Sequence, residues 1–484
     1  MNVITILLDT LRRDHLGCYG NDWIRTPTID ALARRSTVFE KAYVASYPCM
    51  PNRRDIWTGR YEFPWRGWGR LEPTDIDFPS VLKLADRVSM LVTDHFHLWR
   101  AGSGNYHWNF GGFELIRGQE SDNWKTGRSI EPRYPAAPDK LAQHLPRHHV
   151  EQYLRNIAGR TEEQDWFFPQ VAQRAIEWLD QNHGQKDFCL FIDSFDPHEA
   201  WDPPRKYWEP YDPGYNGEDI TWPSYGAADR YARAELRHIR ALYAGKLTMV
   251  DTWLAKLMAR VEELGLMDNT VIILTTDHGI MLGEHNVIGK PSTNFPDSNL
   301  YEELVHVPLL VYVPNAPPGR CAELVQPVDL FATILDACGV SPPEGSHGAS
   351  LLRLAGGDGP WSRTHAWWGR FGEAIGITDG RWVLLKWPDG DRNEPLYWYS
   401  RTPPEWTPFY TFIGPPELDR FPIGVKRGQR ASALYDMATD PAQERDLSRE
   451  RPDELARLCR ALAAQLRAVG APDEQLDRLG LRDA

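Results

Sequence analysis

The stretch NVITILLDTLRRDHLG, residues 2–17, contains the pattern that decides the fold. Its first part, VITILL at 3–8, is almost wholly apolar, rich in β-branched residues, and followed directly by Asp9. Short runs of this kind are typical of strands that are buried on both faces of a mainly parallel sheet. Four further runs have the same character: VSMLV at 88–92, FCLFI at 188–192, TVIILTT at 270–276 and LLVYV at 309–313.

Helical patterns separate these runs. They predict helices over 28–36, 168–182 and 238–265, the last of which ends at Gly265. The sequence therefore predicts an α/β sandwich with a mainly parallel central sheet flanked by helices. Residues 99–165 and 199–230 are rich in Trp, Tyr, Pro, Gly and Asn without sustained periodicity, and we interpret them as long insertions over one end of the sheet.

The pattern changes near residue 365 to short alternating pieces, followed by an Arg/Ala/Leu-rich helix at 451–468. We expect a small antiparallel subdomain with a terminal helix. A chain of 484 residues is too long for one compact core, because single cores stop growing at about 250–300 residues. The predicted division is a large α/β domain over 1–364 and a carboxyl-terminal α+β subdomain over 365–484.

Composition excludes several classes of protein. The hydrophobic content of 42% and charged content of 25% are those of a globular protein, and no apolar run approaches the ~20 residues that span a bilayer. A net charge of −13 argues against nucleic acid as a partner. The first segment has no basic leader, and the six cysteines show no framework spacing, so we expect a cytoplasmic protein with unpaired thiols.

Polar side chains follow four of the predicted strands. Asp9 follows the first, His95 and His97 the second, Asp196 and His198 the third, and the pair Asp277 and His278 the fourth. In an open α/β sheet, ligands bind beyond the carboxyl ends of the strands. We therefore expect these acids and imidazoles to meet at one edge of the sheet.

Three of these side chains suit a metal ion. Asp9, Asp277 and His278 offer hard oxygen ligands and one imidazole, a set that fits a divalent cation with positions left open. A further ligand is expected from Cys49 in CMPNR at 49–53. Pro51 is suited to the first turn of a helix that begins near Cys49, and a helix N-terminus favours an anion or an oxyanion.

These motifs together resemble a known family. CMPNR is similar to the CxPxR signature of the type I sulfatases of the alkaline-phosphatase superfamily. Further resemblances occur in the expected order along most of the chain: ITILLDTLRRDHLGCYG at 4–20, FDPHEAW at 195–201, TTDHGIMLGEH at 275–285, GK at 289–290 with YEELVHVPLLVYVP at 301–314, and ALYDMATDPAQERDL at 433–447. A five-residue pattern recurs by chance, whereas the ordered set is strong. The resemblance implies an alkaline-phosphatase-like fold.

The resemblance also implies a mechanism. Cys49 would be oxidised to formylglycine by the formylglycine-generating enzyme, and one hydroxyl of the aldehyde hydrate would bind one divalent metal ion, Ca²⁺ or Mn²⁺, and attack sulfur or phosphorus. His198 would protonate the leaving group, and the second hydroxyl would then expel the sulfate. Arg53 would fix the geometry around residue 49, and Lys290 would clamp a substrate oxygen. His97 would occupy a histidine position of the family.

Three positions depart from the family pattern. Thr10 stands where a second acid is usual, so that one carboxylate ligand is either absent or replaced by a weaker oxygen. His95 stands where the family places a lysine that contacts the sulfate, and His278 stands where an amide is usual. Asp-Thr and Asp-His also occur in the superfamily's branch of phosphonate monoester and phosphodiester hydrolases, which keep the modified cysteine.

Two enzymatic functions therefore compete. The first is a sulfuric ester hydrolase that acts on a small alkyl or aryl sulfate, and the second is a phosphonate monoester or phosphodiester hydrolase. A third hypothesis, a non-catalytic binding or scaffold protein, is disfavoured by the complete set of expected site residues. The aromatic, Pro-rich segment at 397–425 would suit an interface arm of a homo-oligomer.

Overall fold

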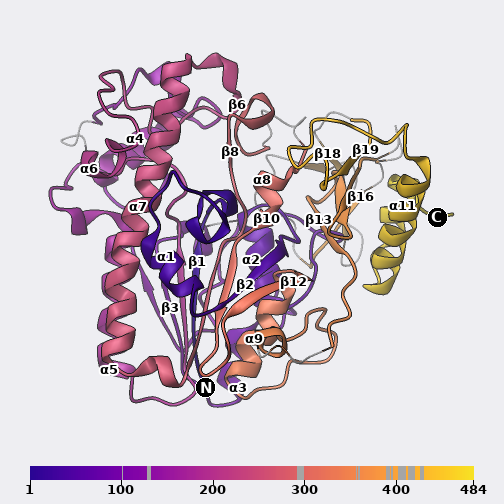
Figure 1. Ribbon diagram of the computed structural model, residues 1–484, viewed down its shortest axis with the longest axis horizontal. Coiled ribbons are helices and arrows are strands. Elements are labelled where there is room, and N and C mark those ends of the chain that lie inside the picture. Colours follow the sequence, from indigo (N-terminus) through magenta and orange to yellow (C-terminus); the bar gives the residue numbers. More distant parts are fainter. Residues whose placement is uncertain are drawn as a thin grey trace.

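The computed structural model of the protein describes residues 1–100, 102–127, 132–291, 299–355, 357, 360–388, 393, 396–401, 410–412, 420–425 and 430–484. Its central feature is a sheet with the strand order β10-β2-β11-β7-β1-β5-β3-β4, in which β12 also pairs with β2 (Figure 1). The strands of this sheet are β1 (Asn2–Leu8), β2 (Thr37–Tyr43), β3 (Ser89–Thr93), β4 (Gly112–Leu115), β5 (Cys189–Ser194), β7 (Thr270–Thr275), β10 (His306–Val307), β11 (Leu309–Tyr312) and β12 (Gly319–Val325).

The first quoted run forms the middle of this sheet. β1 runs parallel to both β5 and β7, and β3 runs parallel to β5 and β4. All five predicted runs form strands, and the sheet is mainly parallel. Two strands differ in direction, because β11 runs antiparallel to β7 and to β2, and the short β10 runs antiparallel to β2. Of these two, β11 is a predicted strand. The apolar pattern that predicted this strand contains no information on its direction.

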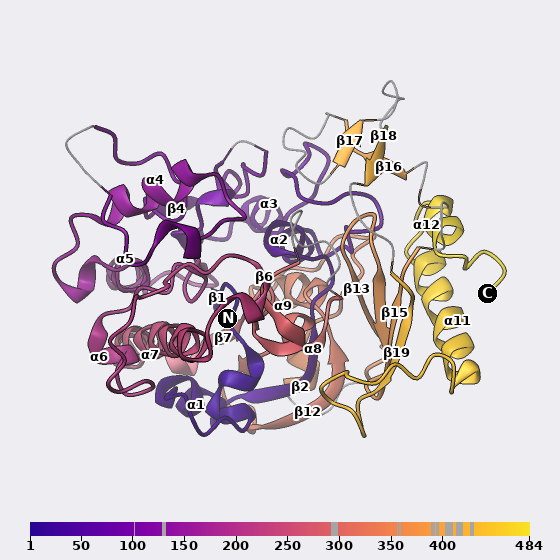
Figure 2. The ribbon, with the colours of Figure 1, turned by 90° about the horizontal axis from the view of Figure 1, so that it is seen from above.

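Alternate residues of β1 enter two different apolar layers. Ile4, Ile6 and Leu8 pack with α1, α5 and α7 on one face, whereas Val3 and Leu7 pack with α2, α3 and α9 on the other. Figures 1 and 2 show these helices on the two sides of the sheet. The bounds are α1 (Pro27–Ala33), α2 (Cys49–Thr58), α3 (Phe78–Leu84), α5 (Phe167–Asn182), α7 (Arg233–Glu263) and α9 (Val328–Ala337). The chain is thus a helix–sheet–helix sandwich.

The three predicted helices are present as α1, α5 and α7. Gly265 follows α7 with a φ of +68°, a left-handed conformation that glycine adopts without strain and that stops the helix. The prediction for 99–165 was partly wrong, because α4 (Arg147–Ile157) forms there and buries Val150, Tyr153 and Leu154. The spacing of these three residues is helical, but the Trp- and Pro-rich surroundings obscured it. No helix among the described residues is long and apolar enough to cross a membrane.

Several short elements lie between the longer strands and helices of the chain. Three of them form a small sheet in the order β6-β9-β8, and Lys290 follows β9 directly. These elements are β6 (Gly226–Ala227), β8 (Met281–Leu282), β9 (Val287–Gly289), α6 (Arg205–Trp208), α8 (Glu302–Val305) and α10 (Leu352–Ala355).

The carboxyl-terminal part is an antiparallel sheet covered by a helix. The strand order is β13-β14-β15-β19, and α11 packs on this sheet through an apolar layer that includes Leu458, Leu462 and Leu466 (Figure 2). The bounds are β13 (Ala366–Gly369), β14 (Ile375–Thr378), β15 (Trp382–Lys386), β19 (Ala433–Asp436), α11 (Pro452–Ala468) and α12 (Asp473–Arg478). The predicted antiparallel subdomain with a terminal helix is therefore present, while the domain boundary at 364/365 stays a prediction.

A second small antiparallel sheet has the order β16-β18-β17 and comprises β16 (Leu396–Tyr399), β17 (Tyr410–Phe412) and β18 (Arg420–Val425). It falls within the segment 397–425 that we interpreted as an interface arm. Residues 402–409 and 413–419 of that segment lie outside the described residues, and homo-oligomer formation stays a prediction.

Candidate active site

Cys49 is the first residue of α2, and all ten residues of this helix are buried. The helix ends at Gly59, whose φ of +67° is left-handed, and Pro51 occupies the first turn, where a missing N–H costs nothing. The Cys49 Sγ lies 3.1 Å from His278 Nε2 and 3.7 Å from Lys290 Nζ. Burial, with the nearby Asp9 charge, raises the pKa of the Cys49 thiol well above its ordinary value, which disfavours a thiolate.

Four side chains from three parts of the chain meet around this cysteine. Asp9, Cys49, Asp277 and His278 are all buried, and each offers one ligand atom within 4.8 Å of the others. Asp9 follows β1, and Asp277 and His278 follow β7, so that the parallel pairing of these two strands brings the carboxylates together. Burial lowers the pKa of His278 to about 4, which leaves its imidazole neutral and able to bind a metal ion. The predicted cluster is thus assembled at one edge of the sheet.

Unpartnered oxygens show that this cluster fits a cation. Asp9 Oδ1 and Thr10 Oγ1 are buried and have no hydrogen-bond partner in the part of the chain that the structure describes. A buried oxygen without a partner costs about 1–3 kcal/mol, which a bound cation would relieve. Burial, followed by the Asp277 charge, raises the pKa of Asp9 well above its ordinary value, and a cation between the two carboxylates would remove this repulsion.

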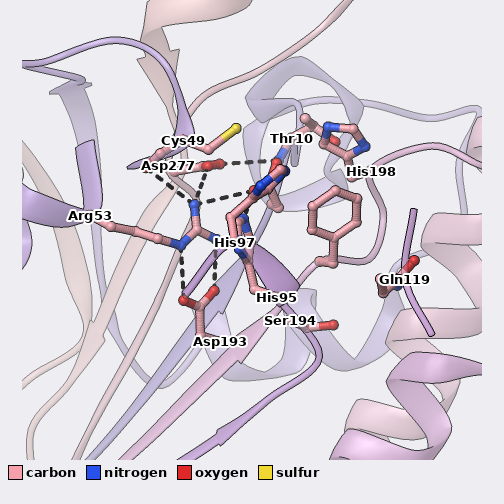
Figure 3. A network of polar contacts seen from close by, with 12 residues as sticks. Thr10, Cys49, Arg53, His95, His97, Gln119, Asp193, Ser194, His198 and Asp277 are labelled. Carbon is pink, nitrogen blue, oxygen red and sulfur yellow. Dashed lines mark hydrogen bonds and ion pairs between the residues drawn. The ribbon is translucent and has the colours of Figure 1, made fainter. Parts of the chain in front are cut away.

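The backbone at Thr10 also has an unusual conformation. Its φ is +60°, which for a β-branched residue costs about 1–3 kcal/mol. In this conformation the Thr10 N–H donates a hydrogen bond to Asp277 Oδ1 at 3.2 Å. The hydrogen bond made in this strained conformation links the segment after β1 to the segment after β7. Thr10 lies close to Asp277 in the site (Figure 3).

Arg53 lies beneath the cluster and contacts three carboxylates (Figure 3). Its Nη1 donates to Asp277 Oδ2 at 2.6 Å and lies 3.2 Å from Asp9 Oδ2. Its Nε and Nη2 donate to the two oxygens of Asp193 at 2.9 and 2.7 Å. Arg53 is one helical turn after Cys49, so that α2 presents the cysteine and the guanidinium on the same side. One guanidinium therefore orients the acids that would hold a metal ion.

Replacing Arg53 with methionine is expected to lower the free energy of unfolding by about 3–5 kcal/mol, because Asp9, Asp193 and Asp277 would remain buried without their cation. Loss of the guanidinium raises the folded-state pKa of these acids, so the deficit shrinks as the pH falls and they become protonated. Urea unfolding in chelator between pH 5 and 8 measures this. The matched variant Arg54→Met loses bonds to the carbonyls of Gly67 and Gly69 and should show a deficit that does not change with pH. Parallel pH profiles for the two variants would contradict the prediction.

His198 and Lys290 form a direct pair on the other side of Cys49. Lys290 Nζ lies 2.7 Å from His198 Nε2, and an ammonium can only donate, so the imidazole accepts there and carries its proton on Nδ1. His198 Nδ1 donates to the Glu199 carbonyl at 2.8 Å and lies 3.3 Å from Glu199 Oε2. Tyr225 donates its hydroxyl proton to Glu199 Oε1. The tautomer of His198 is thus set by Lys290 on one nitrogen and by the backbone carbonyl of Glu199 on the other. The buried Glu199 carboxylate lies beside this pair, and the sequence analysis missed it.

Glu199 makes stability depend on pH. Burial raises its pKa to about 7, above its ordinary value of 4.5. The folded state therefore holds a proton that the unfolded state releases, and the resulting stability is complete below about pH 4.5 and is lost as the pH rises through about 7.

Replacing Glu199 with glutamine is expected to remove this dependence and to make the variant more stable than the wild type by about 3 kcal/mol at pH 8. The two proteins should unfold alike below about pH 4.5. Urea midpoints across this range measure the difference, with Glu177→Gln, at a half-buried position of α5, as the control. Identical pH profiles for the wild type and Glu199→Gln would exclude a raised pKa at Glu199.

His95 and His97 follow β3, and His95 lies next to the cluster. His95 Nε2 is 3.1 Å from Asp9 Oδ2, so His95 contacts an expected metal ligand directly. His97 Nε2 is 3.2 Å from Glu120 Oε2, and its ring lies 5.3 Å from the ring of His95. Both imidazoles have pKa values below the ordinary value because they are buried. They are neutral hydrogen-bonding groups at neutral pH.

One predicted residue of this edge lies elsewhere. Asp196 does not join the cluster, because its carboxylate lies 3.1 Å from Lys246 Nζ and accepts a hydrogen bond from Gln119. In its place the third strand contributes Asp193 to Arg53. Sequence reasoning missed Asp193 and Glu120. An acid inside the apolar run FCLFIDS is a signal that could have identified Asp193, whereas Glu120 lies in an irregular segment without such a pattern.

Comparisons with known proteins give the family model and the relatives that the chain matches. The model of the sulfatase family matches residues 1–340, and that of the N-sulphoglucosamine sulphohydrolase C-terminal region matches 292–411. An arylsulfatase from Clostridium perfringens is 25% identical over 389 residues, which cover 73% of this chain and 78% of that protein. The multifunctional alkaline phosphatase superfamily protein PehA from Trinickia caryophylli is 26% identical over 411 residues, which cover 72% and 76%. The crystal structure of a phosphonate monoester hydrolase of Agrobacterium radiobacter has a TM-score of 0.70 at 19% identity, covering 97% of this chain and 95% of that chain.

Proposed function

Because the chain belongs to the sulfatase family of ester-bond hydrolases, we propose that it is a formylglycine- and metal-dependent hydrolase of a small alkyl or aryl sulfate. One observation carries this proposal. Cys49, at the start of a buried helix, lies within reach of two carboxylates and two cationic or imidazole side chains. A protonated, enclosed thiol is a poor nucleophile, whereas its oxidised form would present hydroxyls to the same groups.

The residues of the cluster would hold one divalent cation. Asp9, Asp277 and His278 supply ligands, the residue at position 49 supplies another, and Thr10 replaces a carboxylate with a hydroxyl. Calcium prefers more oxygen ligands, and manganese accepts the imidazole, so both ions remain candidates. When bound, such a cation lowers the pKa of a hydroxyl that it contacts.

The proposed reaction has two steps at residue 49. In the first, one hydroxyl oxygen of the aldehyde hydrate forms a bond to sulfur while the bond between sulfur and the leaving oxygen breaks, and the leaving oxygen takes a proton. In the second, the other hydroxyl loses its proton and forms the carbonyl again, while the bond from carbon to the ester oxygen breaks and sulfate leaves. A serine or cysteine ester lacks this second hydroxyl and would require attack by water.

The other side chains receive roles from their positions. Lys290 would hold a substrate oxygen close to residue 49, and Arg53 would fix the acids below it. His95 and His97 would face the transferred group from the end of β3. His198 is the proposed acid for the leaving group; it would act in its protonated form, giving the proton from Nε2, while Nδ1 keeps its bond to the Glu199 carbonyl. Maturation would require the formylglycine-generating enzyme as a partner.

Replacing His198 with alanine is expected to slow esters of poor leaving groups far more than activated ones, by about 10²–10⁴-fold against a few-fold. An activated phenolate leaves without a proton, whereas an alkoxide does not. Plotting log kcat/KM against leaving-group pKa for the wild type and the variant measures this difference. Equal losses across the series would remove His198 from the acid role.

Lys290 could donate the proton instead, because it lies 2.7 Å from the same imidazole nitrogen. The variant Lys290→Met distinguishes the two residues. A clamp on a substrate oxygen predicts a similar loss for all leaving groups, and a proton donor predicts a loss that grows with leaving-group pKa.

A second function remains a candidate on specific residues. Thr10, His95 and His278 depart from the sulfatase pattern in the direction of phosphonate monoester and phosphodiester hydrolases. The multifunctional relative and the phosphonate monoester hydrolase neighbour are consistent with this alternative.

Three esters with one shared leaving group test both functions: para-nitrophenyl sulfate, para-nitrophenyl phenylphosphonate and bis(para-nitrophenyl) phosphate. Their kcat/KM values are compared on the same preparation of protein. A preference for the sulfate supports the first function, and a preference for either phosphorus ester supports the second. Hydrolysis of none of the three by protein with confirmed formylglycine would contradict both.

A further inference from the structure

A cavity of about 540 Å³ lies next to the candidate active site. It is lined from two segments, one that follows β3 and includes Phe96, Trp99 and Arg100, and one that follows β4 and includes Arg117. The helix α4 closes it with Arg155 and its neighbours, near β4 in Figure 2. His95 and His97 also follow β3. The cavity and the cluster around Cys49 therefore lie at the same carboxyl edge of the sheet.

The wall between the two sites is thin. The ring of Phe96, which lines the cavity, lies 4.1 Å from the ring of His97. Glu120 contacts His97 at 3.2 Å, and its neighbour Ser121 lines the cavity. Burial acts to raise the pKa of Glu120, yet its hydrogen bond with His97 and the positive charge of Lys290 act to lower it. The Glu120 carboxylate therefore joins the wall of the cavity to His97 of the candidate active site.

Positive charge predominates in the cavity. Arg100, Arg117 and Arg155 contribute three guanidiniums, and the two carboxylates of the lining, Asp122 and Glu151, already have partners. Asp122 accepts both Nε and Nη2 of Arg117, and Glu151 accepts from Tyr134 and Arg147. The lining therefore holds more guanidiniums than carboxylates, and its carboxylates are already engaged.

Two of these arginines keep donors for a ligand. Arg155 Nη1 donates to Gln152 at 3.0 Å, while its buried Nε has no partner among the residues that the structure describes. Arg117 uses one edge of its guanidinium for Asp122 and is 40% exposed. Phe96 and Trp99 add aromatic surface, against which the ring of a leaving group can pack. A planar guanidinium is suited to a carboxylate, sulfate or phosphate group.

We propose that this cavity binds a second anionic group, such as a carboxylate or a further sulfate, on the leaving group of the substrate. The inference rests on the proposed function, because it places the ester at Cys49 and the rest of the substrate past His97. The substrate would then be an ester whose leaving alcohol carries a second anionic group. Esters of neutral alcohols would be handled less well.

Binding to the Cys49→Ala protein tests this without turnover. Isothermal titration gives Kd for para-(carboxymethyl)phenyl sulfate and for its carboxamide, and for the same pair lengthened by one phenyl ring. The matching phenylphosphonate esters are titrated in parallel, so that the result does not depend on which acid is transferred. For at least one length, the carboxylate should bind about tenfold more tightly than the amide, and this ratio should fall at high salt.

Variants locate the effect. In Arg155→Gln the ratio of the two Kd values is expected to fall toward one, and Arg117→Gln should act in the same direction if it folds. The control Arg174→Gln removes the same charge from the exposed face of α5 and should leave the ratio unchanged.

Equal Kd values for carboxylates and amides at both lengths would overturn the proposal. A preference that survives both Arg155→Gln and Arg117→Gln would also overturn it. Hydrolysis of the neutral carboxamide esters by the wild type tests the proposed function separately. Loss of this hydrolysis would count against the catalytic proposal, whereas equal Kd values would count against the cavity proposal.

Discussion

Replacing Cys49 with alanine is expected to lower kcat by a factor on the order of 10⁴ or more, because the proposed reaction forms and breaks its covalent bonds at this residue. The fold should persist, since a buried thiol contributes only about 1 kcal/mol of apolar burial. Steady-state kinetics with the preferred ester, together with circular dichroism and thermal unfolding, measure both effects. Cys49→Ser should complete at most one turnover, because its ester has no second hydroxyl to expel sulfate.

Cys189→Ala is the matched control. Cys189 is equally buried, in β5, but lies in the apolar layer beneath the sheet, so its loss should lower stability and leave kcat within a few-fold. If Cys49→Ala kept a substantial part of the wild-type kcat, residue 49 would not be the nucleophile.

Replacing Asp277 with asparagine is expected to lower the affinity for the divalent ion by about 10²-fold or more and to lower kcat at limiting metal. The variant removes one of two facing carboxylates and leaves an amide oxygen, which is a weaker ligand for a hard cation. Bound metal per chain after equilibration at defined free Ca²⁺ or Mn²⁺ measures the change. In the wild type, a metal concentration of about 1,000 times Kd should stabilise the fold by about 4 kcal/mol relative to chelator, and this gain should largely disappear in the variant.

Asp196→Asn provides the comparison for this prediction. Asp196 is also buried and follows a neighbouring strand, but its carboxylate contacts Lys246 and not the cluster. Its replacement should lower stability and keep the metal content. Equal metal content in Asp277→Asn and in the wild type at limiting metal would show that Asp277 is not a ligand.

The fold followed from the sequence to the extent that local patterns contain it. Five apolar runs predicted five strands, because a strand that is buried on both faces consists mostly of apolar and β-branched residues. β2 was missed, because its sequence TVFEKAY places Glu40 and Lys41 in a half-buried position. The direction of β11 is set by its neighbours and not by its own residues. The helix α4 was hidden by aromatic and Pro-rich flanks that resemble a loop.

The candidate site was also predicted only in part. Residues directly after strands could be predicted to meet, because parallel pairing aligns strand ends, and Asp9, His95, Asp277 and His278 indeed lie together. Contacts that depend on side-chain direction could not be predicted. Asp196 turns toward Lys246, and Asp193 turns toward Arg53. The position of Glu199 beside His198 could not be predicted either, because it depends on how the His198 ring is turned. No sequence pattern contains that information.

The mass of the tryptic peptide AYVASYPCMPNR, residues 42–53, shows whether Cys49 is converted to formylglycine. The protein is produced together with an active formylglycine-generating enzyme, and a known substrate of that enzyme in the same cells serves as the positive control. We expect residue 49 to carry an aldehyde in place of its CH₂–SH group, in a fraction that matches the active fraction of the protein. An unmodified cysteine beside a fully modified control would contradict the proposed mechanism.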